Sequence, residues 1–438
     1  MESMDWHAGR DPLEAAAELI PRVLRERAVF PLYQPIIDLA TRTVVGVEAL
    51  ARGPAGSPVE SPRALFAAAT RAGMMPLIDQ LCFTRAIEVA RDATDVAPPL
   101  LFINAEPAAL HHPITPDLLA AVKSQRPFRI VLEYTERAVA THTAALLEIA
   151  HMAHTDGNAL AMDDVGADPL SLAFLPVVEP EVVKLDMHLL RNPHAPGTIE
   201  IAAIASGYAE RTGAIVLAEG IETEDDLATA QALGARWGQG WLFGRPGPLT
   251  AIAGRPIDHH ARLRPPRPDL HLPSGTPFSL AAVRHHSRAG DHRMVDGLTD
   301  YLLSVAMRTG SHTVVLGAYP DLTVGRAWLP RLASLTAAFV GIVGPALAGV
   351  EPRQVRLTAA PAPIPGGTET VLAVFGPHAA VALCVRPGHR GGVDFVLTHD
   401  PNLVHAVARM LMWRLDTVHR AMDPPIVDPE ATPATVAS

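Results

Sequence analysis

The chain has 438 residues, which is too long for one ordinary domain and predicts two. Apolar residues make up 48% of the chain and charged residues 19%, a balance typical of globular rather than disordered proteins. The formal net charge of −10 argues against general binding to nucleic acid or to an anionic membrane.

The first 28 residues predict a leading helix. Asp11 can cap this helix, Pro12 suits its first position, and apolar residues follow at helical spacing. Pro21 is expected to bend or restart the helix. The segment lacks the apolar core of a signal peptide.

Residues 29–250 alternate short apolar runs with helical segments. Eight runs are strand candidates: AVFPLYQPII, TVVGVEALAR, LLFINAEP, RIVLEYTE, ALAMDDVG, EVVKLD, AIVLAEGIE and WGQGWLFGRP. Strands that alternate with helices over this length predict an α/β fold, a (β/α)₈ barrel of the TIM-like kind. The continuous hydrophobicity of the runs fits strands that are buried on both faces.

The C-terminal half predicts a second, smaller unit. Residues 251–275 are rich in proline and are expected to form a semi-rigid linker. Residues 276–422 predict a smaller α/β domain, and residues 423–438 a disordered tail. The uncharged run at 332–350 contains three glycines and Pro345, so it predicts a buried helix and turn rather than a membrane span.

The only two cysteines are Cys82 and Cys384. Neither a disulfide framework nor a cysteine-type zinc site can be built from them, so a cytoplasmic location is expected. Two histidine pairs, His259–His260 and His285–His286, could bind metal or sense pH, but their polar setting favours a solvated surface.

Polar residues occur at the end of every apolar run of the predicted barrel. The carboxyl ends of the strands of such a barrel converge on one mouth, where active sites lie. We therefore expect the following residues to face a common cavity: Gln34, Glu48, Arg52, Asn104, Glu133, Glu136, Asp163, Asp164, Lys184, Asp186, Glu219, Glu222 and Gln239.

The residue types at this mouth favour metal-dependent phosphate chemistry. Gathered carboxylates repel one another unless cations neutralise them, which would explain the adjacent Asp163 and Asp164. Carboxylates with the Asn104 amide suit Mg²⁺ or Mn²⁺, and a shared aspartate can hold two ions roughly 3.5–4 Å apart. Any single strand-end carboxylate is more often a helix cap or a surface residue, but that reading does not explain polar ends on every strand.

These motifs resemble the EAL-domain cyclic di-GMP phosphodiesterases over about residues 25–250. The letters EAL stand at residues 48–50, and Arg52 completes the EALxR form. YQPI, FINAEP, LEYTE, MDDVG, VKLD, AEGIET and GQGWLFGRP are similar to the other motifs of the family and occur in order. The resemblance implies a barrel whose first strand is antiparallel to the rest. It implies hydrolysis of cyclic di-GMP to linear pGpG by water that two Mg²⁺ or Mn²⁺ ions activate, inhibition by Ca²⁺, and a homodimer through this domain.

The resemblance also implies roles for individual residues. It assigns the first ion to Glu48, Asn104, Glu133 and Asp163, and the second to Asp163, Asp164 and Asp186. It makes Glu219 the general base or a ligand of metal-bound water, and Lys184 the group that holds this water or stabilises developing charge. Its substrate-binding residues are Gln34, Arg52, Glu222 and Gln239, of which Glu222 and Gln239 also fix geometry near the metals. Glu136 is expected to support the loop after the fifth strand.

The loop after the two aspartates departs from the family pattern. The family reads close to DDFGTGYSSL, whereas this chain reads DDVGADPLSL. Pro169 is expected to stiffen the loop and Asp168 to add a carboxylate near the metals, while no ligand is removed. These features favour an active enzyme. Two alternatives stay open: an inactive or weakly active receptor for cyclic di-GMP, and a scaffold whose barrel only dimerises.

Residues 276–422 weakly resemble the DICT domain, a presumed sensory module. The similarity lies in strand order and an FxxTHD-like stretch, without a catalytic motif. The resemblance implies a regulatory domain that senses a signal or docks a protein partner, and the sequence names neither.

Overall fold

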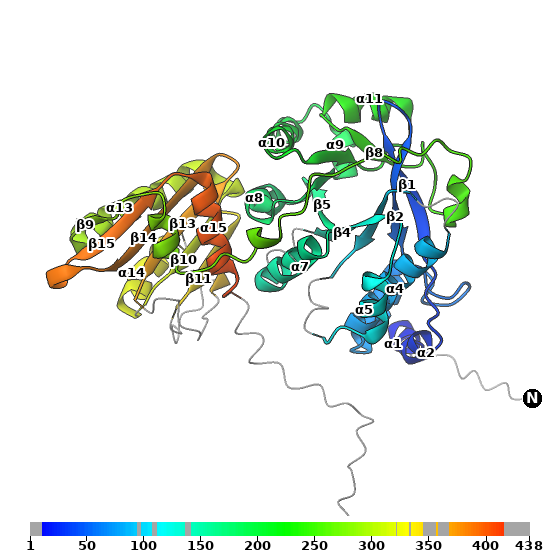
Figure 1. Cartoon of the computed structure of the whole chain (residues 1–438), viewed down its shortest axis with the longest axis horizontal. Helices are drawn as coiled ribbons and strands as arrows, with labels where there is room; N and C mark the ends of the chain where they lie inside the picture. The colour runs from blue at the N-terminus through cyan, green and yellow to red at the C-terminus, as the bar shows by residue number, and fades with distance from the viewer. Residues whose placement is uncertain are drawn as a thin grey trace, which may run out of the picture.

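The computed structural model describes residues 11–93, 98–106, 112–135, 142–320, 322–332, 334–344, 356–357 and 368–415. A closed barrel and a seven-stranded sheet lie side by side (Figure 1). The expected tail at 423–438 falls outside the described residues.

The barrel contains the eight strands predicted from the sequence, in chain order. They are β1 (Leu32–Asp38), β2 (Val44–Leu50), β3 (Leu100–Asn104), β4 (Arg129–Thr135), β5 (Ala159–Val165), β6 (Val182–Leu185), β7 (Ile215–Ala218) and β8 (Trp237–Gln239). Strand β1 is antiparallel to both of its neighbours, β2 and β8, and the other pairings are parallel. The predicted barrel fold is confirmed.

Several of the barrel helices begin at side-chain caps that the sequence supplies. The barrel helices are α3 (Pro62–Arg71), α4 (Met75–Asp92), α5 (Pro116–Lys123), α7 (Thr143–Thr155), α8 (Pro169–Val178), α9 (Met187–Arg191), α10 (Pro196–Thr212) and α11 (Glu224–Ala232). Ser61, Thr115 and Asp168 each accept a hydrogen bond from a backbone N–H of the first turn and precede a proline. Such caps satisfy amides that otherwise have no partner within the helix, and they set where each helix starts.

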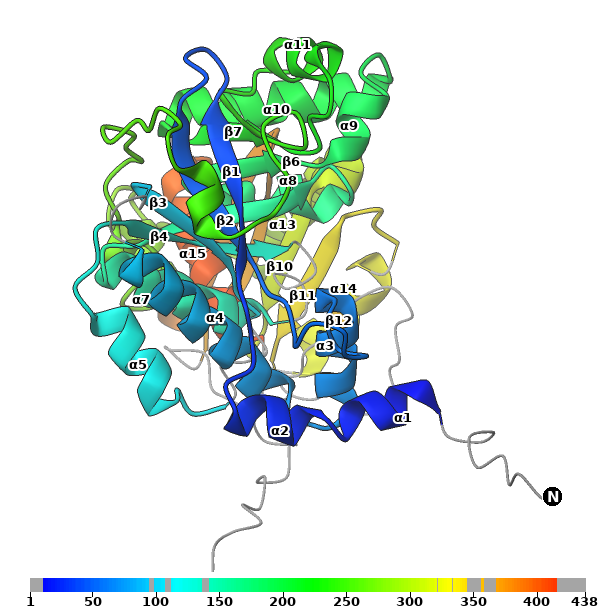
Figure 2. The same ribbon diagram turned by 90° about the vertical axis from the view of Figure 1, so that its right-hand side faces the viewer.

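The leading segment forms two short helices, α1 (Pro12–Ala17) and α2 (Ile20–Arg25). Asp11 caps α1 by accepting a hydrogen bond from Leu13 N at 3.0 Å, and the helix restarts just before Pro21, as predicted. The pair packs beside α3 at one end of the barrel (Figure 2), where Ile20 is fully buried against Leu65.

The proline-rich segment lies on the barrel instead of spanning solvent. It contains only short 3₁₀ turns, at Leu249–Ile252 and Pro268–Leu270. Asp258 N donates to Val44 O at 2.9 Å, and Ala261 and Leu263 are buried among the apolar residues of the barrel strands. The prolines prevent regular structure, but the apolar side chains between them still pack against the barrel.

The second unit is a sheet in the order β12-β11-β10-β13-β14-β15-β9. Its strands are β9 (Arg288–Gly290), β10 (Val314–Ala318), β11 (Phe339–Val343), β12 (Arg356–Leu357), β13 (Thr370–Gly376), β14 (Ala379–Pro387) and β15 (Val393–Thr398). Its helices are α12 (Pro277–Ala282), α13 (His292–Thr309), α14 (Leu322–Leu332) and α15 (Pro401–Met412), with 3₁₀ turns at Gly310–His312 and His389–Gly391.

One prediction for this unit is wrong. The uncharged run at 332–350 was expected to form a buried helix and turn, but it contains strand β11, which pairs in parallel with β10. A fully buried strand and a buried helix have the same uncharged composition, and the β-branched Val340, Ile342 and Val343 favour the strand. No helix in the described ranges is long and apolar enough to cross a membrane.

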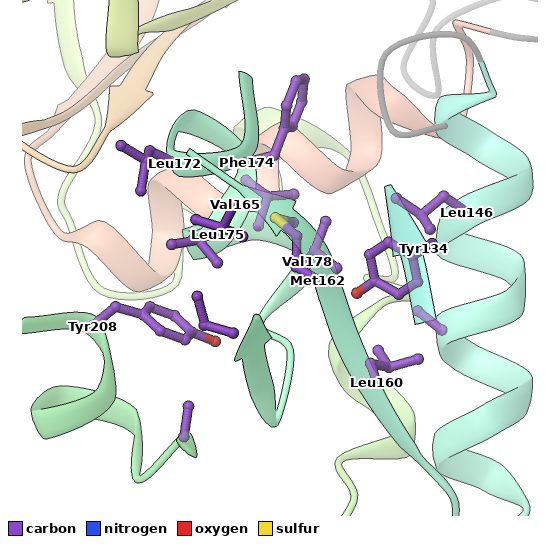
Figure 3. Close-up of a cluster of buried hydrophobic side chains, with 14 of the residues drawn as sticks. Tyr134, Leu146, Leu160, Met162, Val165, Leu172, Phe174, Leu175, Val178 and Tyr208 are labelled. Carbon is purple, nitrogen blue, oxygen red and sulfur yellow. The ribbon is translucent and has the colours of Figure 1, made fainter. Parts of the chain in front are cut away.

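Helix α8 joins the two units. Its sequence, PLSLAFLPVV, has no charged residue, so no face of the helix is suited to water. Leu175 and Val178 lie beside Met162 and Val165 of β5 (Figure 3), while Phe174 stacks edge-on against Phe339 and Phe375 of the second sheet, at 5.5 and 6.5 Å between ring centroids. The helix that follows the two aspartates is therefore buried on both sides.

Candidate active site

The carboxyl ends of consecutive barrel strands bring the predicted polar side chains to one mouth. Glu48, Asn104, Glu133, Asp163 and Lys184 lie on β2 to β6 in that order. Glu219 directly follows β7, and Gln239 ends β8. Asn104 is paired with Glu133 in the strand register, and Gln34 of β1 is paired with Glu48.

Lys184 lies at the centre of this group, and its side chain is fully buried. Its Nζ atom is 2.7 Å from Glu133 Oε1, 2.9 Å from Asp163 Oδ1 and 2.8 Å from Glu219 Oε1. Glu48 Oε2 lies farther away, at 3.9 Å. One ammonium group thus faces carboxylates from four different strands or strand ends.

These contacts are ion pairs rather than aligned hydrogen bonds. Lys184 Nζ, Glu133 Oε1 and Asp163 Oδ1 are buried, and none of them has a hydrogen-bond partner in the described part of the chain. These two oxygens share one ammonium with Glu219, so a cation bound here would reduce the repulsion among the carboxylates.

A hydrogen-bond network holds the β1, β2 and β8 side of the mouth. Gln239 Nε2 donates to Glu48 Oε2 at 2.6 Å and to Gln34 Oε1 at 3.0 Å. Asn104 Nδ2 donates to Glu48 Oε1 at 3.1 Å and to Glu133 Oε2 at 3.3 Å. Asn104 can offer its oxygen to a cation at this position only if its side-chain amide flips, so that Oδ1 takes the place of Nδ2.

Asp163 and Asp164 reach the same side of the barrel because β5 is irregular there. Successive side chains of a regular strand point to opposite faces. The register of β5 against β6 shifts between Met162 and Val165, and Asp164 adopts a left-handed φ of 55°. Oxygens of Asp163, Asp164 and Glu219 consequently lie within 4.8 Å of one another, a grouping that could hold a metal ion.

The crowding of acids shifts their protonation. Burial raises the pKa of Glu133 well above its usual range, and the negative charges of Glu48 and Asp163 raise it further. Burial likewise raises the pKa of Glu219 to about 8, against the opposing effect of Lys184. Burial lowers the pKa of Lys184, but its four acidic neighbours outweigh this effect and keep it charged. The mouth therefore carries more carboxylates than one ammonium can neutralise.

Three other predicted residues lie at the rim. Asp186 caps α9 by accepting a hydrogen bond from His188 N at 2.7 Å, and it is not part of the acidic group around Asp164. Glu222 is exposed and lies 3.7 Å from Arg191. Arg52 is half-buried and donates to Ala51 O at 2.7 Å. Glu136 lies outside the described residues.

The unusual loop residues after the aspartates start a helix. Asp168 accepts a hydrogen bond from Leu170 N at 2.9 Å, and Pro169 occupies the first turn of α8. Asp168 is therefore a helix cap, and the expectation that it also adds a carboxylate near the metals stays a prediction. An aspartate followed by proline is a common way to begin a helix, and this alternative is readable from the sequence.

Sequence reasoning did not single out some residues beside the site. A cavity of about 400 Å³ next to Asn104 and Glu133 is also lined by Asp79, Glu106 and Thr135. Burial and the charge of Glu106 raise the pKa of Asp79 to about 8. Glu106 could have been noticed two residues beyond Asn104, whereas Asp79 lies within helix α4 and has no local signal.

Comparison with known sequences identifies the barrel. A family profile described as "EAL domain" matches residues 17–246, just over half of the chain. The chain belongs to the EAL-domain family. The resemblance of residues 276–422 to the DICT domain stays a prediction.

Two curated relatives and one solved structure illustrate the similarity to other EAL proteins. "Probable cyclic di-GMP phosphodiesterase PdeG" of Escherichia coli is 26% identical over 240 residues, which cover 52% of this chain and 46% of the relative. "Cyclic di-GMP phosphodiesterase PA2567" of Pseudomonas aeruginosa is 30% identical over 257 residues, covering 55% and 43%. BlrP1 of Klebsiella pneumoniae, solved as a manganese and cyclic di-GMP complex, is 30% identical with a TM-score of 0.44, covering 50% of this chain and 56% of that one. The chain spans less than half the length of these two curated relatives.

Proposed function

We propose that the EAL domain of this chain is a metal-dependent phosphodiesterase that hydrolyses cyclic di-GMP to linear pGpG. The observation that carries the proposal is the convergence of Glu48, Glu133, Asp163 and Glu219 on one buried lysine at the mouth of the barrel, with Asp164 grouped beside Asp163 and Glu219. Membership of the EAL family supports the choice of substrate.

The donor set fits divalent cations. Asp163, Asp164 and Glu219 form one group that could hold an ion, and Glu48, Asn104 and Glu133 lie beside it. All of these side chains offer oxygen donors, which suits Mg²⁺ or Mn²⁺, and the ions would neutralise the carboxylates that Lys184 alone does not balance. We propose two ions, with Asp163 shared between them and Asp186 as a further ligand of the second.

Bound ions would supply Lewis-acid activation of water and would offset negative charge on the phosphate. Side chains of the protein would supply proton transfer and further charge stabilisation. Glu219 leaves 23% of its side chain in solvent and has a raised pKa, so it can accept the proton of the water that attacks phosphorus. Lys184 remains charged and can stabilise the charge that builds on the phosphate oxygens. As the water oxygen bonds to phosphorus, one P–O bond of the ring breaks, and the leaving oxygen takes up the proton that Glu219 accepted.

Residues at the rim would hold the dinucleotide. Arg52 carries a planar cation that suits a phosphate. The amide of Gln34 is fixed by hydrogen bonds with Gln239 and Gly244 O, and Glu222 is exposed. We assign these four side chains to substrate binding, as the family resemblance implies.

We also propose that the protein works in the cytoplasm and as a homodimer through its EAL domain. Cys82 and Cys384 are both free thiols, which suits a reducing compartment. A dimer contact cannot use helix α8 as the chain is folded here, because the second domain covers it.

The test is to incubate the purified chain with cyclic di-GMP and either Mg²⁺ or Mn²⁺, and to measure pGpG by chromatography. We expect pGpG with either ion, none with EDTA, and inhibition by Ca²⁺. Glu48→Ala should lose turnover but keep its fold, whereas Glu210→Ala, an exposed change on α10, should behave as wild type. Saturable binding of cyclic di-GMP in Ca²⁺ without any pGpG in Mn²⁺ would make the domain a receptor, and failure to bind would leave only a scaffold role.

A further inference from the structure

A large cavity lies between the barrel and the second domain, away from the barrel mouth. Its volume is about 920 Å³, which is within the range of small-molecule sites. Barrel residues from the end of α8 and from α10 form one wall. Residues of α13, of the β13–β14 turn and of the start of α15 form the other wall.

The walls of this interdomain cavity concentrate positive charge in an acidic protein. Four arginines line it: Arg211, Arg264, Arg267 and Arg308. Three histidines join them: His378, His399 and His405. Glu179 is the only carboxylate among the described residues that line it, although the whole chain has a formal net charge of −10. Such a local excess of cations attracts anions.

Two of the arginines are available to a ligand. Arg211 and Arg308 lie on opposite walls, and neither has a carboxylate within ion-pair distance among the described residues. Within the described ranges, the Arg308 guanidinium donates only to Ser304 Oγ, at 2.9 Å on its own helix. Arg267 pairs with Glu179, but 51% of its side chain remains exposed. A phosphate between the walls could therefore meet guanidinium groups from both domains.

A buried histidine on the wall lacks a polar partner. His405 Nε2 is buried and has no hydrogen-bond partner in the described ranges, and its ring packs edge-on against Phe375 at 6.0 Å. Burial and the charges of Arg409 and Arg211 lower the pKa of His405 to about 3. In the tautomer that protonates Nε2, an anionic ligand would supply the acceptor that this nitrogen lacks.

An exposed aromatic ring completes the wall. Tyr301 is 41% exposed, and its ring lies edge-on to His399 with 6.2 Å between centroids. Exposed aromatic rings beside basic residues are suited to stacking with a base. We propose that this interdomain cavity binds a nucleotide, with its phosphates between Arg211 and Arg308 and its base on Tyr301.

The same cavity is connected to the barrel mouth through α8. Glu179 ends α8 in a left-handed conformation, and its carboxylate contacts Arg264, Arg267 and Arg409. Arg409 of α15 also donates to Val177 O at 2.7 Å. A phosphate that competes with Glu179 for Arg267 would alter the contacts at the C-terminal end of α8. The N-terminal end of the same helix follows Asp163 and Asp164. Ligand binding should therefore change turnover at the mouth, a consequence that rests on the proposed function.

Binding is tested by titration calorimetry on the full chain in EDTA, with GTP, ATP, inorganic pyrophosphate and guanosine as separate probes. We expect at least one nucleotide to bind more tightly than pyrophosphate, and guanosine not to bind. Arg211→Ala with Arg308→Ala should weaken nucleotide binding about tenfold or more, and Tyr301→Ala should reduce it to the level of pyrophosphate. Arg293→Ala, on the same helix as Arg308 but outside the cavity, is the control.

Each outcome decides the proposal. It is overturned if neither nucleotide binds, or if binding is unchanged in the double arginine variant. Equal affinity for pyrophosphate and nucleotides would overturn the stacking role of Tyr301. A nucleotide that binds here should change kcat/KM for cyclic di-GMP about fivefold or more, and the double variant should lose this effect. If the wild type forms no pGpG, the proposed function fails while the calorimetry still decides whether the cavity binds nucleotides. If binding occurs but turnover does not respond, the coupling through α8 is wrong.

Discussion

Lys184 Nζ lies 2.7 Å from Glu133 Oε1, although their strands, β6 and β4, are not neighbours in the barrel. Asp163 of the intervening strand β5 lies 2.9 Å from the same ammonium. Lys184 is one of only two lysines in the chain. A single compact cation thus holds three adjacent strand ends together before any metal ion is present.

Replacing this lysine should therefore weaken both folding and turnover. Lys184→Met leaves buried carboxylates without their counter-charge, so we expect the metal-free protein to lose about 3–5 kcal/mol of stability. Turnover should fall at least about 100-fold, because the charge on the phosphate loses a stabilising cation. Calorimetric unfolding should show that Mn²⁺ restores part of the stability of Lys184→Met. Lys123→Met, at the exposed end of α5, is the control and should change neither property.

Asp164 should show a conflict between stability and function. Its oxygens lie among those of Asp163 and Glu219, and its backbone is left-handed. Asp164→Asn keeps a side chain that tolerates this conformation and removes one negative charge. We expect metal-free Asp164→Asn to unfold at a temperature equal to or above that of the wild type, while its turnover is lost. A lower unfolding temperature together with normal turnover would show that the charge of Asp164 serves structure and not chemistry.

The strands and most residues of the site could be predicted from the sequence, because both follow from local sequence patterns. Each barrel strand is a short apolar run, and each run ends in a polar group at the mouth. Asp164 is different: period-two alternation directs it away from Asp163, and only the register shift in β5 brings the two together. Strand β11 was missed because burial on both faces removes the pattern that separates a strand from a helix.

The interdomain contacts could not be predicted because they join distant parts of the chain. Arg211 and Arg308 belong to different domains and to no motif, so only the packing of α8 against the second sheet brings them to one cavity. The absence of charged residues in α8 indicates that the helix is buried on all sides. It does not indicate which surface of the protein packs against it.

Stability should depend on pH through His271. Burial lowers the pKa of His271 well below its usual value, as does the charge of Arg409, and its Nε2 lies 2.7 Å from Val178 O. The unfolded chain therefore binds more protons than the folded chain below about pH 6.5, so this histidine reduces stability as pH falls.

Urea unfolding at pH 7 and pH 5 isolates this effect. We expect His271→Gln, which keeps a donor for Val178 O, to lose roughly 1–2 kcal/mol less stability than the wild type between the two pH values. Glu133 and Glu219 have raised pKa values and act in the opposite direction, but they are common to both proteins and cancel in the comparison. Equal losses in the two proteins would show that His271 does not contribute.

Contact between α8 and the second sheet should matter for turnover as well as folding. Phe174→Ala removes the ring that stacks on Phe339 and Phe375, and should cost about 3–5 kcal/mol. Phe395→Ala removes a ring of similar burial within the second domain, away from α8, and serves as the control. We expect similar loss of stability in both, measured by urea unfolding, but reduced turnover only in Phe174→Ala. Equal turnover in the two variants would argue against coupling through α8.

The most direct test of the account is a titration of the purified chain with Mn²⁺, in which electron paramagnetic resonance measures the free ion. We expect the wild type to bind two Mn²⁺ ions per chain. Asp163→Asn, which changes the aspartate proposed to be shared, should weaken both sites. If Mn²⁺ remains free with the wild type, or if Asp163→Asn binds as well as the wild type, the acids at the barrel mouth do not form a metal centre.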